Sequence, residues 1–254
     1  MLLRKDERIK AMTKIIRAEF LKAKRTMSSK LIFAFPIIAL VMAFVLTAGI
    51  TNAYAESAWN WWYVFLLPGM IAIISYLTVI REKKNGYYNI KTLPIEKRNL
   101  MLGKIIYLGI LVLVSNAVLF AGATLGGIFL TTSVPVVGAA ITVIVLTIVQ
   151  LWQIPLYLFL SDKFGMVVEI IVCLSLTVLG VSVAPSEKWF LVVSAISTRV
   201  VTPLLHVLPN GMRAQAGDSL LSSCVIFPGI IIALAHFVLL TYLYLNWFEK
   251  REVK

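Results

Sequence analysis

Six long apolar runs, separated by short polar or basic segments, set the pattern along this chain of 254 residues. Each run has close to or more than the ~20 residues that an α-helix needs to cross a bilayer core of ~30 Å. The pattern predicts six membrane-spanning helices, at about 31–50, 58–80, 105–130, 138–160, 166–184 and 223–248. An all-α polytopic membrane protein is therefore the expected fold class.

Residues 1–30, ahead of the first span, combine ten Lys and Arg residues with three acids and with apolar residues at roughly helical spacing. These apolar residues are Ile9, Met12, Ile15, Ile16, Phe20 and Leu21. The pattern predicts an amphipathic helix lying flat on the membrane, and a simple topology anchor would show the same pattern. We expect one transmembrane domain over 1–254, with the six spans in 31–248 and a tail in 249–254.

Composition supports the membrane class. Hydrophobic residues make up 60% of the chain and charged residues 14%, which is more apolar than a soluble core can bury. The net charge of +12 does not indicate nucleic-acid binding, because the basic residues cluster at the ends of the apolar runs. Cys173 and Cys224 show no metal-ligand spacing, so we expect neither a metal site nor a structural disulfide.

The Lys and Arg residues also orient the spans, because an excess of them marks the cytoplasmic side. With six spans and both termini in the cytoplasm, 21 of the 24 Lys and Arg residues fall on that side. The other side holds Lys188, Arg199 and Arg213. We therefore expect a multi-pass protein of the cell membrane with both termini inside the cell.

The segment 81–104, between the second and third spans, carries seven Lys and Arg residues against two acids. It is therefore expected on the cytoplasmic side. Gly86 and Pro94 interrupt it, and residues 95–103 mix apolar and charged side chains. We expect a short amphipathic helix over 95–103 at the membrane surface, which can serve as a handle for a partner.

An aromatic cluster opens the second span, where Trp59, Trp61, Trp62 and Tyr63 lie within five residues. Such clusters are typical of the membrane interface and can simply anchor a helix there. The same cluster would also suit an aromatic rim that receives or releases an amphipathic substrate. The sequence leaves both interpretations open.

Four polar residues fall inside the apolar runs, namely Asn116, Gln150, Gln153 and Glu169. Gln150 and Gln153 share one helix face, and Pro155 frees a nearby carbonyl, so we expect a kink that points polar groups into the protein. Polar residues at membrane depth are functional candidates, and a hydrogen bond between helices explains them as well. Glu169 lies in a first helical turn, where the helix dipole stabilises an acid, so we interpret it as stabilising rather than as a proton carrier.

Residues 185–222 do not have the pattern of an ordinary loop. The apolar runs 189–196 and 200–208 are too short to cross a membrane, and they are interrupted by Pro203, Pro209, Asn210 and Gly211. Irregular backbone at membrane depth must be covered by protein. We therefore expect two short helices that dip into the outer leaflet or cap the outer mouth as an external lid.

Several catalytic motifs are absent from the sequence. It has no Gly-xxxx-Gly-Lys-Ser/Thr phosphate loop, no HExxH pair and no Gly-x-Ser-x-Gly turn. It also lacks the paired buried carboxylates of a proton relay. We therefore expect no catalytic site and no cofactor in this chain, and any energy that it uses must come from a partner.

Several segments carry a resemblance to a known family, among them Trp59-Asn-Trp-Trp-Tyr-Val-Phe-Leu-Leu-Pro-Gly-Met70, Leu208-Pro-Asn-Gly211 and the segments 16–26, 82–86, 93–95, 152–156 and 164–165. They resemble the ABC-2-type permeases of lantibiotic immunity systems, in particular the E-type subunit (MutE/EpiE-like). The resemblance implies a type V exporter-like permease domain in the membrane of a Gram-positive bacterium. It also implies a second, different permease subunit, two copies of a cytoplasmic ABC ATPase that binds ATP and Mg²⁺, and contact with membrane lipid.

On this resemblance, the protein would remove lantibiotic peptide from the membrane and return it to the medium, which protects the producer. Closure of the ATPases would push the segment 81–104 and tilt the second and third spans. The residues expected to contact the ATPase are Glu82, Gly86, Tyr87, Leu93 and Pro94. Those expected to line the outer substrate route are Trp59, Asn60, Trp61, Trp62, Asn210 and Gly211.

Two other functions stay open at this point. The same kind of permease could export another amphipathic peptide, a bacitracin-like antibiotic or a lipid. A non-transporting membrane scaffold is the third hypothesis, since the sequence shows no ion site. A panel of cargoes would separate the first two, and failure to copurify an ATPase would favour the third.

Overall fold

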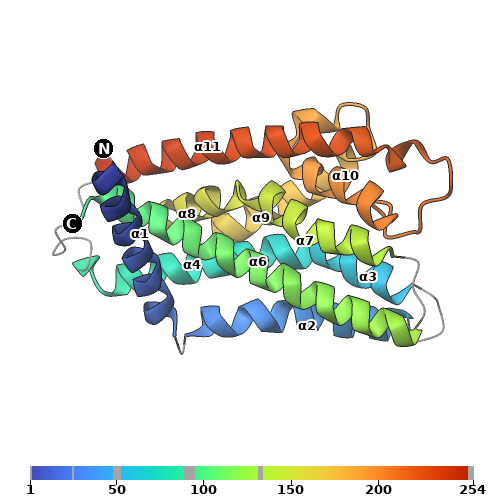
Figure 1. The fold of residues 1–254 in the computed structure, drawn as a ribbon, viewed down its shortest axis with the longest axis horizontal. Coiled ribbons are helices and arrows are strands. Elements are labelled where there is room, and N and C mark those ends of the chain that lie inside the picture. The colour runs from blue at the N-terminus through green and yellow to red at the C-terminus, as the bar shows by residue number, and fades with distance from the viewer. Residues whose placement is uncertain (1, 25, 48–52, 89–94, 131–133, 251–254) are drawn as a thin grey trace.

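The computed structural model describes residues 2–24, 26–47, 53–88, 95–130 and 134–250, with side chains from Ile9 onward (Figure 1). Over these residues the fold is all-helical, which confirms the predicted class. The α-helices are α1 (Leu2–Ala23), α2 (Met27–Thr47), α3 (Tyr54–Trp61), α4 (Leu67–Lys84), α6 (Lys97–Leu130), α7 (Val136–Gln150), α8 (Gln153–Lys163), α9 (Met166–Val183), α10 (Val193–Leu205) and α11 (Ile226–Lys250). Four short elements complete the fold, namely the π turn η1 (Trp62–Leu66) and the 3₁₀ turns η2 (Trp189–Leu191), η3 (Ser219–Leu221) and η4 (Ser223–Val225).

Five helical stretches in the described residues are long and apolar enough to cross a membrane, and α7 with α8 makes a sixth if the pair is one bent span. This agrees with the six predicted spans. The two helices of the pair meet at 43°. Pro155 has no N–H for the Leu151 carbonyl, which accepts instead from the Ile154 N–H at 3.1 Å, so the backbone tightens at the break. The kink expected from Pro155 is thus confirmed.

α1 lies across the ends of the spanning helices (Figure 1). It ends at Ala23 rather than near residue 30. Its buried residues Ile15, Glu19 and Ala23 repeat every fourth position, which places them on one face of the helix. Gly103 of α6 leaves the space that the Ile15 side chain occupies. α1 is therefore packed on the helical bundle and does not rest on the membrane alone.

α6 begins at Lys97 and continues for 34 residues. The separate amphipathic helix expected over 95–103 is therefore wrong, because residues 97–103 are the first turns of a spanning helix. Leu100, Met101 and Lys104 are buried against the bundle, and this packing favours a continued helix over one that lies on the membrane. The expected ATPase contacts Leu93 and Pro94 lie outside the described residues.

The fully described stretch 185–222 contains one α-helix, α10, and not the two that were expected. Pro203 lies in the last turn of α10, where the loss of one backbone hydrogen bond does not end the helix. α10 packs against α7, α9 and α11 at the end of the bundle opposite α1 (Figure 1). With 13 residues it is too short to cross a membrane, which agrees with the predicted re-entrant or capping role.

Candidate functional site

Five charged side chains meet where α1 crosses the ends of α4 and α6, and we name them the charge network. Glu82 of α4 accepts from Lys104 of α6 at 2.7 Å and from Lys22 of α1 at 3.0 Å. Glu19 of α1 pairs with Arg81 of α4 at 3.0 Å. Glu19 also accepts from Lys22 at 2.8 Å and from Lys104 at 3.3 Å.

The centre of the charge network is shielded from solvent, since Glu19, Glu82 and Lys104 expose only 2%, 3% and 4% of their surfaces. Lys22 and Arg81, at its edge, are partly exposed. Charges that leave water are stable only when they are paired. Burial lowers the pKa of Lys22, but Glu19 and Glu82 outweigh that effect and raise the pKa above its ordinary value. The Lys22 ammonium therefore stays charged at neutral pH, and the network fastens α1, α4 and α6 together.

The end of α4 closes with a Schellman turn. The Tyr87 N–H bonds the Glu82 carbonyl and the Gly86 N–H bonds the Lys83 carbonyl, each at 2.9 Å. Gly86 has a φ of 58°, a left-handed conformation that glycine adopts without strain. The turn leaves Gly86 exposed at the surface.

Tyr87 points back into the protein and is buried. Its φ of 54° is uncommon for a residue with a side chain, and its hydroxyl donates to Asp162 of α8 at 2.6 Å. Asp162 also pairs with Lys83 at 3.3 Å. The Tyr87 ring lies 6.4 Å from that of Phe248 in α11, measured between centroids. Segment 81–87 is therefore held to α1 and α6 through the charge network and to α8 and α11 through Tyr87.

The described residues that were expected to contact an ATPase divide into two groups. Gly86 is exposed, whereas Glu82 and Tyr87 are buried. Sequence reasoning missed their partners Glu19 and Asp162. Glu19 carried a signal, because it is an acid within the apolar stripe of α1.

Two of the three tryptophans near the start of the second span are covered by protein. Trp59 and Trp62 are buried, and Trp61 is partly exposed. The Trp62 indole N–H donates to Asn116 of α6 at 2.7 Å, and the Asn116 amide donates to Thr147 of α7 at 2.8 Å. The interfacial belt is therefore wrong for Trp59 and Trp62. Asn116 forms the interhelical hydrogen bond that was one of its two interpretations.

The loop after α10 contacts α3. The Asn60 amide donates to the Pro209 carbonyl at 3.3 Å. Gly211 has a φ of 83°, and a Cβ at this position would lie 3.0 Å from Asn60 Oδ1. Arg213 pairs with the buried Glu56 of α3 at 3.1 Å. Asn60 and Gly211, both expected along the substrate route, therefore lie in direct contact.

A groove of about 280 Å³ opens beside this contact. Asn60 and Asn210 supply amide groups, and Trp61 and Phe65 supply aromatic surface. The complete lining is Asn60, Trp61, Val64, Phe65, Thr177, Val178, Val181, Ser182, Pro209 and Asn210. Trp59 lines a different, apolar cavity of about 340 Å³ that α3 shares with α6 and α7.

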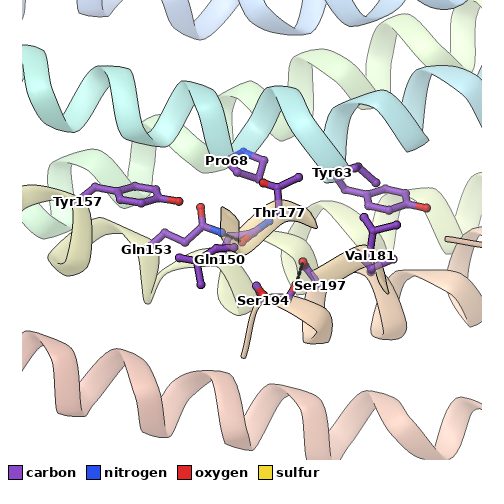
Figure 2. A pocket seen from close by; sticks show the side chains of 12 residues that line it. Tyr63, Pro68, Gln150, Gln153, Tyr157, Thr177, Val181, Ser194 and Ser197 are labelled. Atoms are coloured by element: carbon purple, nitrogen blue, oxygen red, sulfur yellow. Dashed lines mark hydrogen bonds between the residues drawn. The ribbon is translucent and has the colours of Figure 1, made fainter. Parts of the chain in front are cut away.

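Gln150 and Gln153 flank the break between α7 and α8 and line a small internal cavity (Figure 2). The Gln153 amide donates to Gln150 at 2.5 Å. Glu169 does not line this cavity, and it accepts from the Ser161 hydroxyl at 2.6 Å, which links α8 to α9. The spacing of the two glutamines predicted that they share one helix face. No sequence pattern indicated Ser194, Ser197 and Thr198, which line the same cavity.

In the comparison with protein families, the chain matches the model described as ABC-2 family transporter protein. The match covers residues 15–252 and so includes the charge network, the groove and the internal cavity. No curated protein matches the chain.

Proposed function

Because this chain belongs to the ABC-2 family of transporter proteins, we propose that it is a permease subunit that expels lantibiotic peptide from the cell membrane. A permease of this family is a transmembrane subunit, and the family implies an ABC ATPase as partner. In the proposal, two copies of that ATPase and a second, different permease complete the exporter. Export then protects a Gram-positive producer from its own peptide.

In this proposal, the end of the bundle that contains the charge network and Gly86 lies on the cytoplasmic side of the membrane. The support is the distribution of Lys and Arg, which favours the cytoplasmic side. α3 and α10 lie at the end of the bundle opposite α1 (Figure 1). The groove, which Asn60 of α3 helps to line, then lies toward the outer side of the membrane. A peptide in the outer leaflet could enter it and leave for the medium.

One helical stretch joins the two ends, and this observation carries the proposal. α3, η1 and α4 form a single candidate span of 31 residues, Tyr54–Lys84. Asn60 of the groove lies near one end of the stretch, and Glu82 of the charge network lies near the other. An ATPase that displaces Gly86 would move this stretch together with α1 and α6, because the charge network fastens the three.

The lining of the groove suits an amphipathic peptide. Trp61 and Phe65 offer apolar contact, and the amides of Asn60 and Asn210 offer hydrogen bonds. The described lining residues include no charged side chain. The groove therefore favours a ligand segment that is apolar with neutral polar groups.

A lantibiotic-sensitive Gram-positive strain provides the test. The strain would make this chain together with its ABC ATPase and the second permease of the proposal. We expect the inhibitory concentration of the lantibiotic to rise, and Asn60→Leu to reduce that rise while the protein remains in the membrane. An ATPase with an inactivated phosphate loop is the negative control. Unchanged sensitivity with all subunits in the membrane would contradict the lantibiotic assignment.

A lipid is a second candidate cargo, favoured by the apolar cavity of about 340 Å³ beside Trp59. Its lining is apolar apart from Thr124, and four of its nine residues are alanine or glycine, namely Ala55, Ala123, Gly127 and Ala139. Such a lining suits an acyl chain. A panel of lantibiotics, bacitracin-like antibiotics and lipids in one transport assay would decide between the cargoes.

A further inference from the structure

The internal cavity lies where two irregular stretches of helix meet the start of α10. η1 contributes Tyr63 and Val64, and the α7–α8 break contributes Gln150 and Gln153. The first turns of α10 contribute small polar residues, namely Ser194, Ser197 and Thr198. Irregular backbone inside a membrane protein is tolerated where protein covers it or where it lines a polar cavity, and π turns occur frequently at functional positions.

The two glutamines leave one hydrogen-bond donor and one acceptor unused. Gln153 Nε2 donates to Gln150 Oε1, whereas Gln150 Nε2 and Gln153 Oε1 have no partner among the described residues. Both residues are at least nine-tenths buried. Exchanging the oxygen and nitrogen of both amides would again leave one donor and one acceptor. A buried polar group without a partner is destabilising, so this pair points to a ligand.

The other residues around the cavity are uncharged. The Ser194 hydroxyl also lacks a hydrogen-bond partner among the described residues, and Tyr157 presents its hydroxyl end toward the two glutamines (Figure 2). A peptide backbone amide has one N–H donor and one carbonyl acceptor. It is therefore the complement of the unused acceptor and donor of Gln153 and Gln150.

A single wall separates this cavity from the groove, because Val64, Thr177 and Val181 line both. The cavity measures about 10 Å³, which is room for about one water molecule. A larger group can enter only when the wall shifts. Val64 lies in the π turn, where each turn of the helix holds one residue more than a regular turn, and such turns occur frequently at functional sites.

We propose that the cavity is an uncharged hydrogen-bonding subsite of the transport route, which binds one backbone amide of a peptide cargo when Val64 and Val181 move apart. The apolar side chains of that peptide remain in the groove. Gln150 and Gln153 recognise the peptide backbone. The statement that the cargo is a peptide rests on the proposed function.

Stimulation of ATP hydrolysis by the lantibiotic tests the subsite in the complete transporter, reconstituted in nanodiscs. We expect the double variant Gln150→Leu/Gln153→Leu to raise the half-stimulating lantibiotic concentration about tenfold, through the loss of two hydrogen bonds. Thr142→Val is the matched control, because Thr142 is buried on α7 outside the cavity lining. The half-stimulating concentration of this control should equal that of the wild type.

An unchanged half-stimulating concentration in the double variant would overturn the proposed subsite. The cavity would then be a site for a water molecule only. If the lantibiotic fails to stimulate even the wild type, and the sensitive strain gains no protection, the proposed function fails and the subsite fails with it. Stimulation of the wild type with no difference between the variants rejects the subsite alone.

Labelling of a Ser194→Cys variant gives a second test. It does not use the glutamine double variant, so it remains valid if that variant fails to fold. Methyl methanethiosulfonate is small and uncharged, and mass spectrometry resolves its reaction at each cysteine. We expect labelling of residue 194 during ATP turnover and slower labelling when the lantibiotic is present, while Thr142→Cys stays unlabelled. Labelling that is absent during turnover, or equally fast with the lantibiotic, would overturn the proposal.

Discussion

Lys104 and Glu82, which are 22 residues apart in the sequence, face each other with 2.7 Å between the ammonium and the carboxylate. The pair closes the charge network between α6 and α4. Since both side chains are buried, both ends of the basic segment 81–104 are part of the helical bundle.

Glu82→Gln should destabilise the protein by about 3 kcal/mol, because it leaves the buried Lys104 ammonium without a full counter-charge. Thermal unfolding of the purified protein measures the loss. Glu96→Gln, at an exposed position, is the matched control and should change little. The double variant Glu82→Gln/Lys104→Gln should recover part of the stability. Equal unfolding temperatures for Glu82→Gln and Glu96→Gln would contradict the structural role of the network.

Gly86→Val should reduce ATP-coupled transport and cost about 1–2 kcal/mol of stability, because valine does not tolerate the left-handed φ of the Schellman turn. The cause must be conformational, since a Cβ at Gly86 would meet nothing within 4 Å. Gly86→Asn is the control, because asparagine tolerates this conformation. Transport and ATP hydrolysis are measured together. If Gly86→Asn is as impaired as Gly86→Val, the turn geometry is not the cause.

Trp62→Phe should cost about 1–3 kcal/mol, because it removes the indole N–H and leaves Asn116 Oδ1 buried without its donor. Trp61→Phe, at a partly exposed position, should cost less. Unfolding of Trp62→Phe, Asn116→Leu and the double variant forms a cycle. The two single effects should not add, and strict additivity would show that the indole–amide bond contributes nothing.

Gly211→Ala should impair transport more than Gly217→Ala. Both glycines have positive φ, at 83° and 93°, so both substitutions strain the backbone. A Cβ at Gly211 also meets Asn60, whereas one at Gly217 meets nothing within 4 Å. Protection of the sensitive strain measures the difference. The contact between Asn60 and Gly211 has no role in transport if the two variants protect equally.

The spanning helices could be predicted because each apolar run must satisfy its own backbone within lipid, and the helix does so. The bend at Pro155 could be predicted for a similar reason, since proline lacks the N–H that a regular helix uses. The direction that a side chain faces was harder to predict. A tryptophan beside a membrane can point to lipid or to protein, and for Trp62 the hydrogen bond to Asn116 of α6 goes with the direction into protein.

The charge network could not be predicted, because its partners come from three distant segments of the chain. Glu19 and Arg81 are 62 residues apart, and Lys22 and Glu82 are 60 apart. Local patterns contain no information on such pairs. The internal cavity was missed for the same reason, since Ser194 and Tyr63 reach it from different helices.

The way α1 is fastened bears on what a shortened form of the chain would do. A form that starts at Met27 keeps every apolar run and should still enter the membrane. It would lose Glu19, however, so Arg81 would lose the carboxylate with which it pairs, and Lys104 would keep Glu82. The Ile15 side chain would also be missing from the space beside Gly103. Such a form should therefore insert into the membrane, but α1 would no longer fasten α4 to α6. We expect it not to transport cargo when the ATPase hydrolyses ATP.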